Sequence, residues 1–251
     1  MRSSTLTGLA LTTLLASCNL ARADEVTTKS AATWQGVASL RALRKNESTR
    51  TIEVYYPVFA GSRRVARVAG LVLKQDALKS FNGFIKDSQG SARDLGLSGG
   101  MKYNYSLNAS MLLNRPRLIS VATLGYEYTG GAHGVYGSQG YVFGYPQGSV
   151  KPRQLHLADF FADGAAASKR INTLLLAKLR ATKDGDQEAT FVVKGQVKSL
   201  NKDQLEDFAA VEGGLEWYFA PYEVGPYSSG EITVTLTARE LGSQFRAALI
   251  K

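Results

Sequence analysis

A strict alternation of residue types between Lys102 and Met111 is the feature that most constrains the fold of this chain. Tyr103, Tyr105, Leu107, Ala109 and Met111 alternate there with polar residues. Successive side chains of a β-strand point to opposite faces, so this segment has one apolar and one polar face. An antiparallel sheet with one face in water has this pattern. We therefore expect a sheet of that kind, covered on one side.

Other segments predict strands and helices that accompany this one. Further strands are expected at residues 51–58, 118–128, 141–145, 215–219 and 232–236. The strand at 118–128 follows the Asn114-Arg115-Pro116 break, which predicts a hairpin with the alternating segment. Helical spacing of apolar residues predicts helices at 65–87 and 165–180, with shorter ones at 155–161 and 238–249. The pattern predicts an α+β fold, a mainly antiparallel sheet with two principal helices packed on it.

The first 23 residues read as an export signal. Arg2 is a short charged region, and Leu6 to Ala16 form an apolar run that is too short to span a bilayer. Two processing sites compete. Ala21-Arg22-Ala23 precedes a cleavage point at Asp24, whereas Leu15 to Cys18 resembles a lipoprotein box in which Cys18 carries the lipid. We expect a periplasmic or extracellular protein, either free or lipid-anchored.

The remaining chain divides into three expected regions. A polar, mobile leader covers residues 24–33, an N-terminal α+β subdomain covers 34–115, and a C-terminal domain covers 116–251. Whether the two larger regions form one domain stays open at this point. A content of 44% hydrophobic residues is enough for a sizeable packed core.

Cysteine and histidine usage argues against several kinds of chemistry. Cys18 is the single cysteine, so the body of the protein has no internal disulfide. The two histidines, His133 and His156, are not spaced as zinc ligands, and no Gly-x-Ser-x-Gly segment is present. We expect no metal and no cofactor.

The formal net charge of +9 is not distributed as in a nucleic-acid-binding protein. The basic excess lies in the first half and is scattered, without a run of like charges. Residues 202–231 are instead acidic, with Lys202 as their only basic residue. Their acidic residues are Asp203, Glu206, Asp207, Glu212, Glu216, Glu223 and Glu231. We expect an electrically lopsided molecule with no nucleic-acid partner.

Two segments have the composition of functional loops. Tyr126 to Gly134 places three glycines around His133, as in a tight turn or a ligand-contacting loop. The interpretations of His133 are a histidine hydrogen-bonded inside a structural turn and, less favoured, a catalytic histidine. The second segment, Trp217 to Tyr227, has five aromatic residues and two prolines. We expect Trp217 and Phe219 to point inward, with Tyr222 and Tyr227 available for recognition.

These segments, with their order and spacing, resemble a known domain. The ordered set comprises Tyr128–Gly134, Tyr141–Gly148, Leu157–Phe161, Ala165–Arg180, Tyr218–Glu223 and Gly230–Leu236. It resembles the C-terminal domain of RsiV-type anti-sigma factors and PdaC-type peptidoglycan deacetylases. Residues 50–115 resemble the domain that usually precedes it. The segment typical of the deacetylase catalytic domain and the transmembrane helix of an anti-sigma factor have no counterpart here, so we expect the sensor module by itself.

The resemblance implies an extracytoplasmic, largely non-enzymatic module, which in RsiV-type proteins binds lysozyme. The leading hypothesis is therefore an envelope binding module whose partner is a lysozyme-like muramidase or peptidoglycan, in an inhibitor, sensor or accessory role. The alternatives are a cell-wall hydrolase or deacetylase centred on His133, and a basic N-terminal half that holds anionic envelope polymers. The expected binding residues are Tyr128, Gly130, Gly131, His133, Pro221, Tyr222, Glu223 and Tyr227.

Overall fold

The computed structural model describes residues 24–28, 38–94, 102–184, 187–188 and 190–250. The expected export signal, including Cys18, and the expected leader beyond Thr28 lie outside these residues. Among the described helices, none is both long and apolar enough to cross a membrane.

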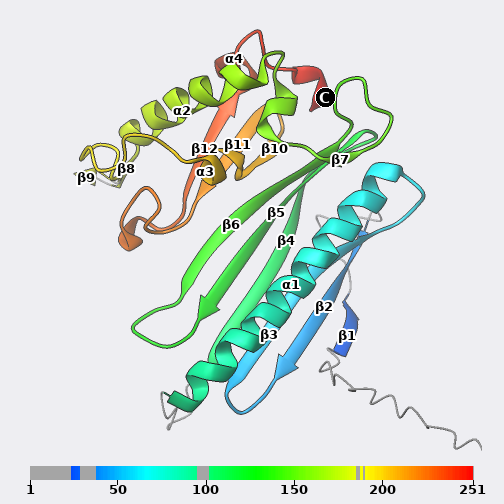
Figure 1. Ribbon diagram of the computed structural model, residues 1–251, viewed down its shortest axis with the longest axis vertical. Coiled ribbons are helices and arrows are strands. Elements are labelled where there is room, and N and C mark those ends of the chain that lie inside the picture. Colours follow the sequence, from blue (N-terminus) through cyan, green and yellow to red (C-terminus); the bar gives the residue numbers. More distant parts are fainter. Residues whose placement is uncertain (1–23, 29–37, 95–101, 185–186, 189, 251) are drawn as a thin grey trace, which may run out of the picture.

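A long, mainly antiparallel sheet forms the body of the protein (Figure 1). Its strands lie side by side in chain order, as β1 (Asp24–Thr28), β2 (Ala38–Asn46), β3 (Arg50–Phe59), β4 (Tyr103–Arg115), β5 (Leu118–Tyr128), β6 (Val135–Gly144) and β7 (Arg153–Gln154). Only β3 and β4 pair in parallel. Parallel neighbours need a crossover connection, and helix α1 (Arg64–Asp94) provides it.

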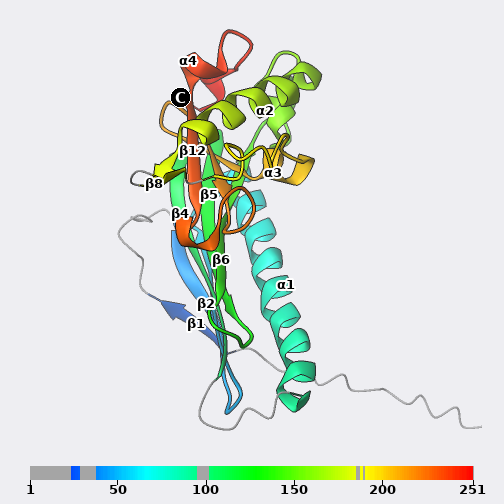
Figure 2. The same ribbon diagram turned by 90° about the vertical axis from the view of Figure 1, so that its left-hand side faces the viewer.

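Helix α1 covers one face of this sheet, as the turned view shows (Figure 2). Its apolar residues pack on Ile119 and Phe143 of β5 and β6, and on Ile52 and Val54 of β3. The apolar core under the helix is divided into two clusters. One lies around Val65 and Leu73, and the other lies around Phe81 and Tyr103.

The second half of the chain packs on the opposite face of the sheet. It has a three-stranded antiparallel sheet, β10 (Phe208–Val211), β11 (Gly214–Phe219) and β12 (Ile232–Thr237), and helix α2 (Gly164–Ala181). Smaller elements are η2 (Leu157–Phe160), β8 (Lys183–Asp184), β9 (Gln187–Glu188), α3 (Lys202–Glu206), η3 (Tyr227–Ser229), α4 (Ala238–Leu241) and η4 (Ala247–Leu249). A single core joins these elements to Leu118 and Val142 of the long sheet.

The predicted α+β class with two principal helices is confirmed, and most predicted elements lie where the patterns indicated. Three local expectations were wrong. Residues 24–28 are not part of a mobile leader, because they pair with β2. The strand expected at 141–145 begins six residues earlier, at Val135. The last helix ends at Leu241 because Gly242 adopts a positive φ of 80°, which breaks the helix.

The predicted boundary between residues 115 and 116 falls in the tight connection between β4 and β5. These strands are paired along their length, so the long sheet contains residues from both sides of that boundary. The division into two domains stays a prediction.

Candidate functional site

The glycine-rich turn between β5 and β6 has the backbone geometry that its composition predicted. Gly130 and Gly131 have φ values of 102° and 92°, a region that side chains with a β-carbon rarely enter. The hydroxyl of Tyr128 donates a hydrogen bond of 3.0 Å to the Gly131 carbonyl. Tyr128 therefore fixes the turn from within.

Gly134 ends the turn at a point of close approach. A β-carbon at this position would lie 2.5 Å from the ring of Tyr126. Only glycine leaves room for the ring, so Tyr126 lies directly against the backbone of the turn. The side chain of Tyr126 is still 36% exposed.

The loop that follows β11 is held by hydrogen bonds within it. The amide of Tyr222 donates to the Gly225 carbonyl at 2.9 Å, and the amide of Glu223 donates to the Ala220 carbonyl at 3.1 Å. The Ala220 amide in turn donates to the Glu223 carboxylate at 2.9 Å. Pro221 is buried beneath the loop. These contacts fix the direction in which Tyr222 projects.

Tyr222 has a strained backbone and an exposed ring. Its φ of 77° makes it the one non-glycine residue with positive φ in the described part of the chain. Its side chain is 56% exposed, although it is a large aromatic ring. A bulky residue in this region of φ is a genuine outlier that costs about 1–3 kcal/mol, and such outliers gather at functional sites.

The turn and the loop meet through Tyr227. Its hydroxyl donates a 3.0 Å hydrogen bond to the Gly134 carbonyl. Its ring stacks on His133 at a centroid distance of 3.8 Å, and it also contacts the rings of Tyr136 and Tyr222 at 6.0 and 5.7 Å. Two segments about 90 residues apart in the sequence thus form one surface. We call Tyr126, His133, Tyr136, Tyr222 and Tyr227 the aromatic surface.

Three carboxylates lie next to the aromatic surface, along the free edge of β6. Asp207 accepts a 2.8 Å hydrogen bond from the Gly140 amide, and Glu231 accepts from the amide and the hydroxyl of Ser138. Glu223 is the third member of this carboxylate cluster. Asp207 and Glu231 thus cap backbone amides of β6 that would otherwise be available for pairing with another strand.

The negative charges of the carboxylate cluster are uncompensated. Burial, together with the charges of Glu223 and Glu231, raises the pKa of Asp207 to about 7. Burial and the charge of Glu231 raise the pKa of Glu223 as well. None of the three forms an ion pair with a residue that the structure describes. Asp207 and Glu223 border an open hollow of about 600 Å³.

The surroundings of His133 do not favour the hydrolase or deacetylase interpretation. Its Nδ1 lies 3.1 Å from the Gly134 carbonyl, and its ring stacks on Tyr227. No carboxylate hydrogen-bonds it among the described residues, so nothing orients it as a general base. The other histidine, His156, is 3.3 Å from Glu206 in the neighbouring hollow. Within the described residues, no group of three potential ligands could hold a metal ion.

The predicted binding residues come together, with different roles. His133, Tyr222 and Tyr227 form contacts of the aromatic surface, while Tyr128, Gly130, Gly131 and Pro221 shape the turn and loop beneath it. Glu223 belongs to the carboxylate cluster. The sequence-based prediction did not include Tyr136, which lies on the part of β6 that precedes the strand expected at 141–145. It also missed the individual roles of Asp207 and Glu231, although the acidic stretch that contains them was noted.

Two family models match parts of this chain. Residues 43–136 match the model described as "Deacetylase PdaC", and residues 158–238 match that described as "Protein of unknown function (DUF3298)". The comparison with curated proteins finds no match.

Solved structures of the second family have a similar fold. A DUF3298 family member from Bacteroides fragilis is 16% identical, with a TM-score of 0.59 over 86% of this chain and 98% of that one. A DUF3298 family protein from Pseudomonas aeruginosa is 14% identical, with a TM-score of 0.53 over 85% and 95% of the two chains. At these identities the likeness shows the fold alone.

Proposed function

We propose that this chain is a cell-envelope binding module that recognises a basic, lysozyme-like muramidase through its aromatic surface. The single observation that carries the proposal is the assembly of the turn and the loop into one exposed aromatic surface beside uncompensated carboxylates. The two domain matches suggest an envelope-associated module and so support the proposed location in the cell envelope.

The aromatic surface has the properties of a binding hot spot. Tyrosine offers a large contact area and loses little side-chain entropy on binding, and here stacking has already fixed several rings. The strained backbone of Tyr222 holds its ring out from the loop. A partner would therefore meet a surface that needs little reorganisation.

The carboxylate cluster selects for a basic partner. The charges of Glu223 and Glu231 disfavour the ionised form of Asp207, and a Lys or Arg from a partner would relieve that repulsion. The net charge of +9 would repel a basic protein at long range, so the local acidic surface must face it. A basic muramidase fits this requirement better than peptidoglycan, whose strands carry carboxylates of their own.

Calorimetric titration of the full chain with a purified basic lysozyme tests the proposal. Tyr222→Ala is expected to weaken binding about 30-fold or more, as for a central aromatic anchor. Leu71→Ala, at a 58% exposed position on α1, is the matched control and should leave affinity unchanged. Tyr222→Gly should weaken binding as much as Tyr222→Ala, because the ring and not the backbone makes the contact.

The pH dependence of binding gives a second measurement. Because ionised carboxylates attract a basic partner, affinity should rise between pH 6 and 8 as Asp207, with its pKa near 7, loses its proton.

Peptidoglycan sacculi are the competing probe in a pull-down. Binding to sacculi without binding to lysozyme, or equal affinity of wild type and Tyr222→Ala for lysozyme, would overturn the proposed partner.

A further inference from the structure

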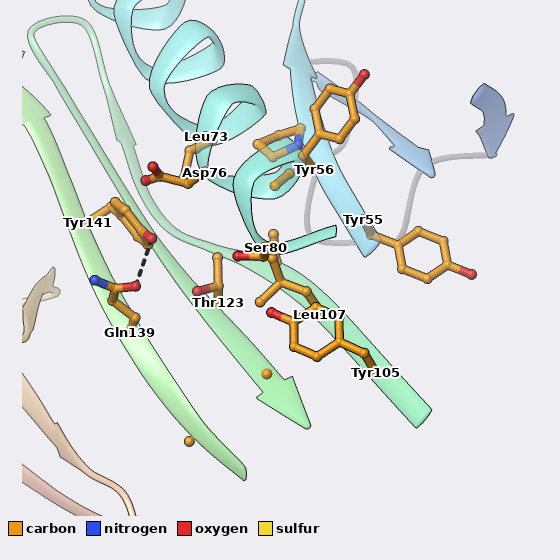
Figure 3. A pocket seen from close by; sticks show the side chains of 15 residues that line it. Tyr55, Tyr56, Leu73, Asp76, Ser80, Tyr105, Leu107, Thr123, Gln139 and Tyr141 are labelled. Atoms are coloured by element: carbon orange, nitrogen blue, oxygen red, sulfur yellow. Dashed lines mark hydrogen bonds between the residues drawn. The ribbon is translucent and has the colours of Figure 1, made fainter. Parts of the chain in front are cut away.

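A cleft lies on the face of the long sheet that α1 covers, between α1 and strands β3 to β6 (Figure 3). It exists because the residues that face each other there are small. Ala77 and Ser80 on the helix and Gly125 and Gly137 on the strands line it. The two core clusters under α1 lie on either side of this gap, so it is a break in otherwise close packing.

Polar side chains from four elements converge on the cleft. Asp76 and Ser80 extend from α1, Tyr105 from β4, Thr123 from β5, and Gln139 and Tyr141 from β6 (Figure 3). The hydroxyl of Tyr141 donates a 2.8 Å hydrogen bond to Gln139.

The rest of the wall of the cleft is aliphatic and aromatic, including Leu73 and Leu107. A mostly apolar wall with a few converging polar groups is the usual composition of a small-molecule site. The groups that converge here are hydroxyls, an amide and a carboxylate, which can both donate and accept hydrogen bonds. They suit a ligand that carries several hydroxyl groups.

The charge of the cleft excludes anions. Asp76 is half-buried and forms no ion pair with a described residue. Its carboxylate lies beside the Tyr141 hydroxyl, and burial and the charge of Asp76 together raise the pKa of Tyr141. Glu127 lies near Tyr105, and burial and the charge of Asp87 raise its pKa. The interior is therefore electronegative. The basic residue at the opening is Lys79, which is exposed to solvent.

The size of the cleft limits the ligand to one ring. Its volume is about 190 Å³, and a cavity of about 150 Å³ is enough to bind benzene. A six-membered ring with a few substituents therefore fits. A second hollow of about 340 Å³ shares Asp76, Ser80, Gln139 and Tyr141 and leads outward past Gly83, so a larger substituent or a second sugar has space outside.

We propose that this cleft binds a single pyranose ring that is neutral or carries an amino group, with Asp76 and Gln139 accepting hydrogen bonds from it. The Tyr105 and Tyr141 rings supply aromatic walls against the ring's C–H faces. The site is distinct from the aromatic surface, which lies at the end of β5 and β6 and includes none of the six polar residues that line the cleft. The inference therefore does not rest on the proposed function.

Titration of the full chain followed by amide chemical shifts tests this site. The probes are glucosamine, N-acetylglucosamine and, as a ring of similar size with the opposite charge, glucuronate. We expect the first two to shift amides of α1 and β6 with dissociation constants on the order of 1 mM. Glucuronate should bind at least about tenfold more weakly, because Asp76 repels it.

Three variants separate the cleft from the rest of the molecule. Asp76→Asn is isosteric and should weaken glucosamine binding about tenfold. Ala77→Leu places a larger side chain in the cleft and should abolish binding. Tyr222→Ala should leave sugar binding unchanged while it weakens lysozyme binding, so each proposal can fail alone. Thermal melts of each variant confirm folding.

Absence of amide shifts with glucosamine and N-acetylglucosamine would overturn the site. So would shifts that persist in the folded Ala77→Leu variant, because the sugar would then bind elsewhere. Equal affinity for glucosamine and glucuronate would overturn the role of Asp76 and the class of ligand.

Discussion

The two faces of the long sheet are packed in different ways. On one face, the second half of the chain forms a single continuous core that runs from Leu118 through Trp217 to Ile250. On the other, α1 contacts the sheet through two clusters separated by a cleft. Continuous packing gives the loop that follows β11 a rigid base, whereas interrupted packing under α1 leaves a space of ligand size. The comparison indicates that one face of the sheet supports a rigid loop, whereas the face under α1 contains a cleft.

The largest expected effect follows from the continuous core. Trp217 is fully buried, contacts Phe208, and donates a 3.0 Å hydrogen bond to the Leu205 carbonyl. Trp217→Ala should lower the free energy of unfolding by about 3–5 kcal/mol through lost contacts and a residual cavity. Urea denaturation measures this change, with exposed Leu71→Ala as a control expected to stay within about 0.5 kcal/mol. A loss below about 1 kcal/mol would mean that this core is not continuously packed.

The second prediction concerns the junction between the second half and the edge of β6, where Asp207 is half-buried against Gly140. The pKa of Asp207 in the folded protein, about 7, lies above its usual value of 3.8. The stability that this difference contributes is complete below about pH 4 and is lost as the pH rises through 7. Its upper limit is about 4 kcal/mol, which solvent access reduces.

Asp207→Asn isolates this contribution, because asparagine keeps an oxygen that can accept from the Gly140 amide. The variant should be more stable than wild type at pH 8 by about 1–3 kcal/mol. The difference between the two should shrink as the pH falls to 4. Chemical denaturation at several pH values measures it, and a difference that does not depend on pH would contradict the raised pKa.

Periodicity predicted most of the elements, because the face that each strand and helix buries is recorded locally in its sequence. The alternation from Tyr103 to Met111 and the helical spacing around Ile171 are examples, and both segments form the expected elements. Val135 to Gly140 lacks such a pattern, since two glycines and two polar residues interrupt it. Its strand depends on pairing with β5, which sequence periodicity does not record.

The candidate site was only partly predictable for a related reason. Composition identified the turn around His133 and the loop around Tyr222 separately. Their contact depends on a single hydrogen bond and a ring stack between residues far apart in the chain. The cleft could not be predicted at all. Ala77 and Gly137 carry no functional signature, and only the packing of α1 on the sheet makes a space between them.

The smallest expected effect compares the two faces directly with the same substitution. Ala210 lies in the continuous core and is 0% exposed, while Ala77 borders the cleft and is 1% exposed. Ala210→Leu should lower the free energy of unfolding by about 1–3 kcal/mol, because a closely packed core has no room for the added methyl groups. Ala77→Leu should change it by less than about 1 kcal/mol, since its side chain can enter the cleft.

Denaturation of both variants under one condition measures the contrast. The two alanines have nearly the same exposure, so a difference between the variants reports the free space around each position and not the loss of solvent contact. Equal losses would mean that the strands close onto α1 in solution. In that case the cleft would be too small for a pyranose ring, and Asp76 would face packed side chains in place of a ligand.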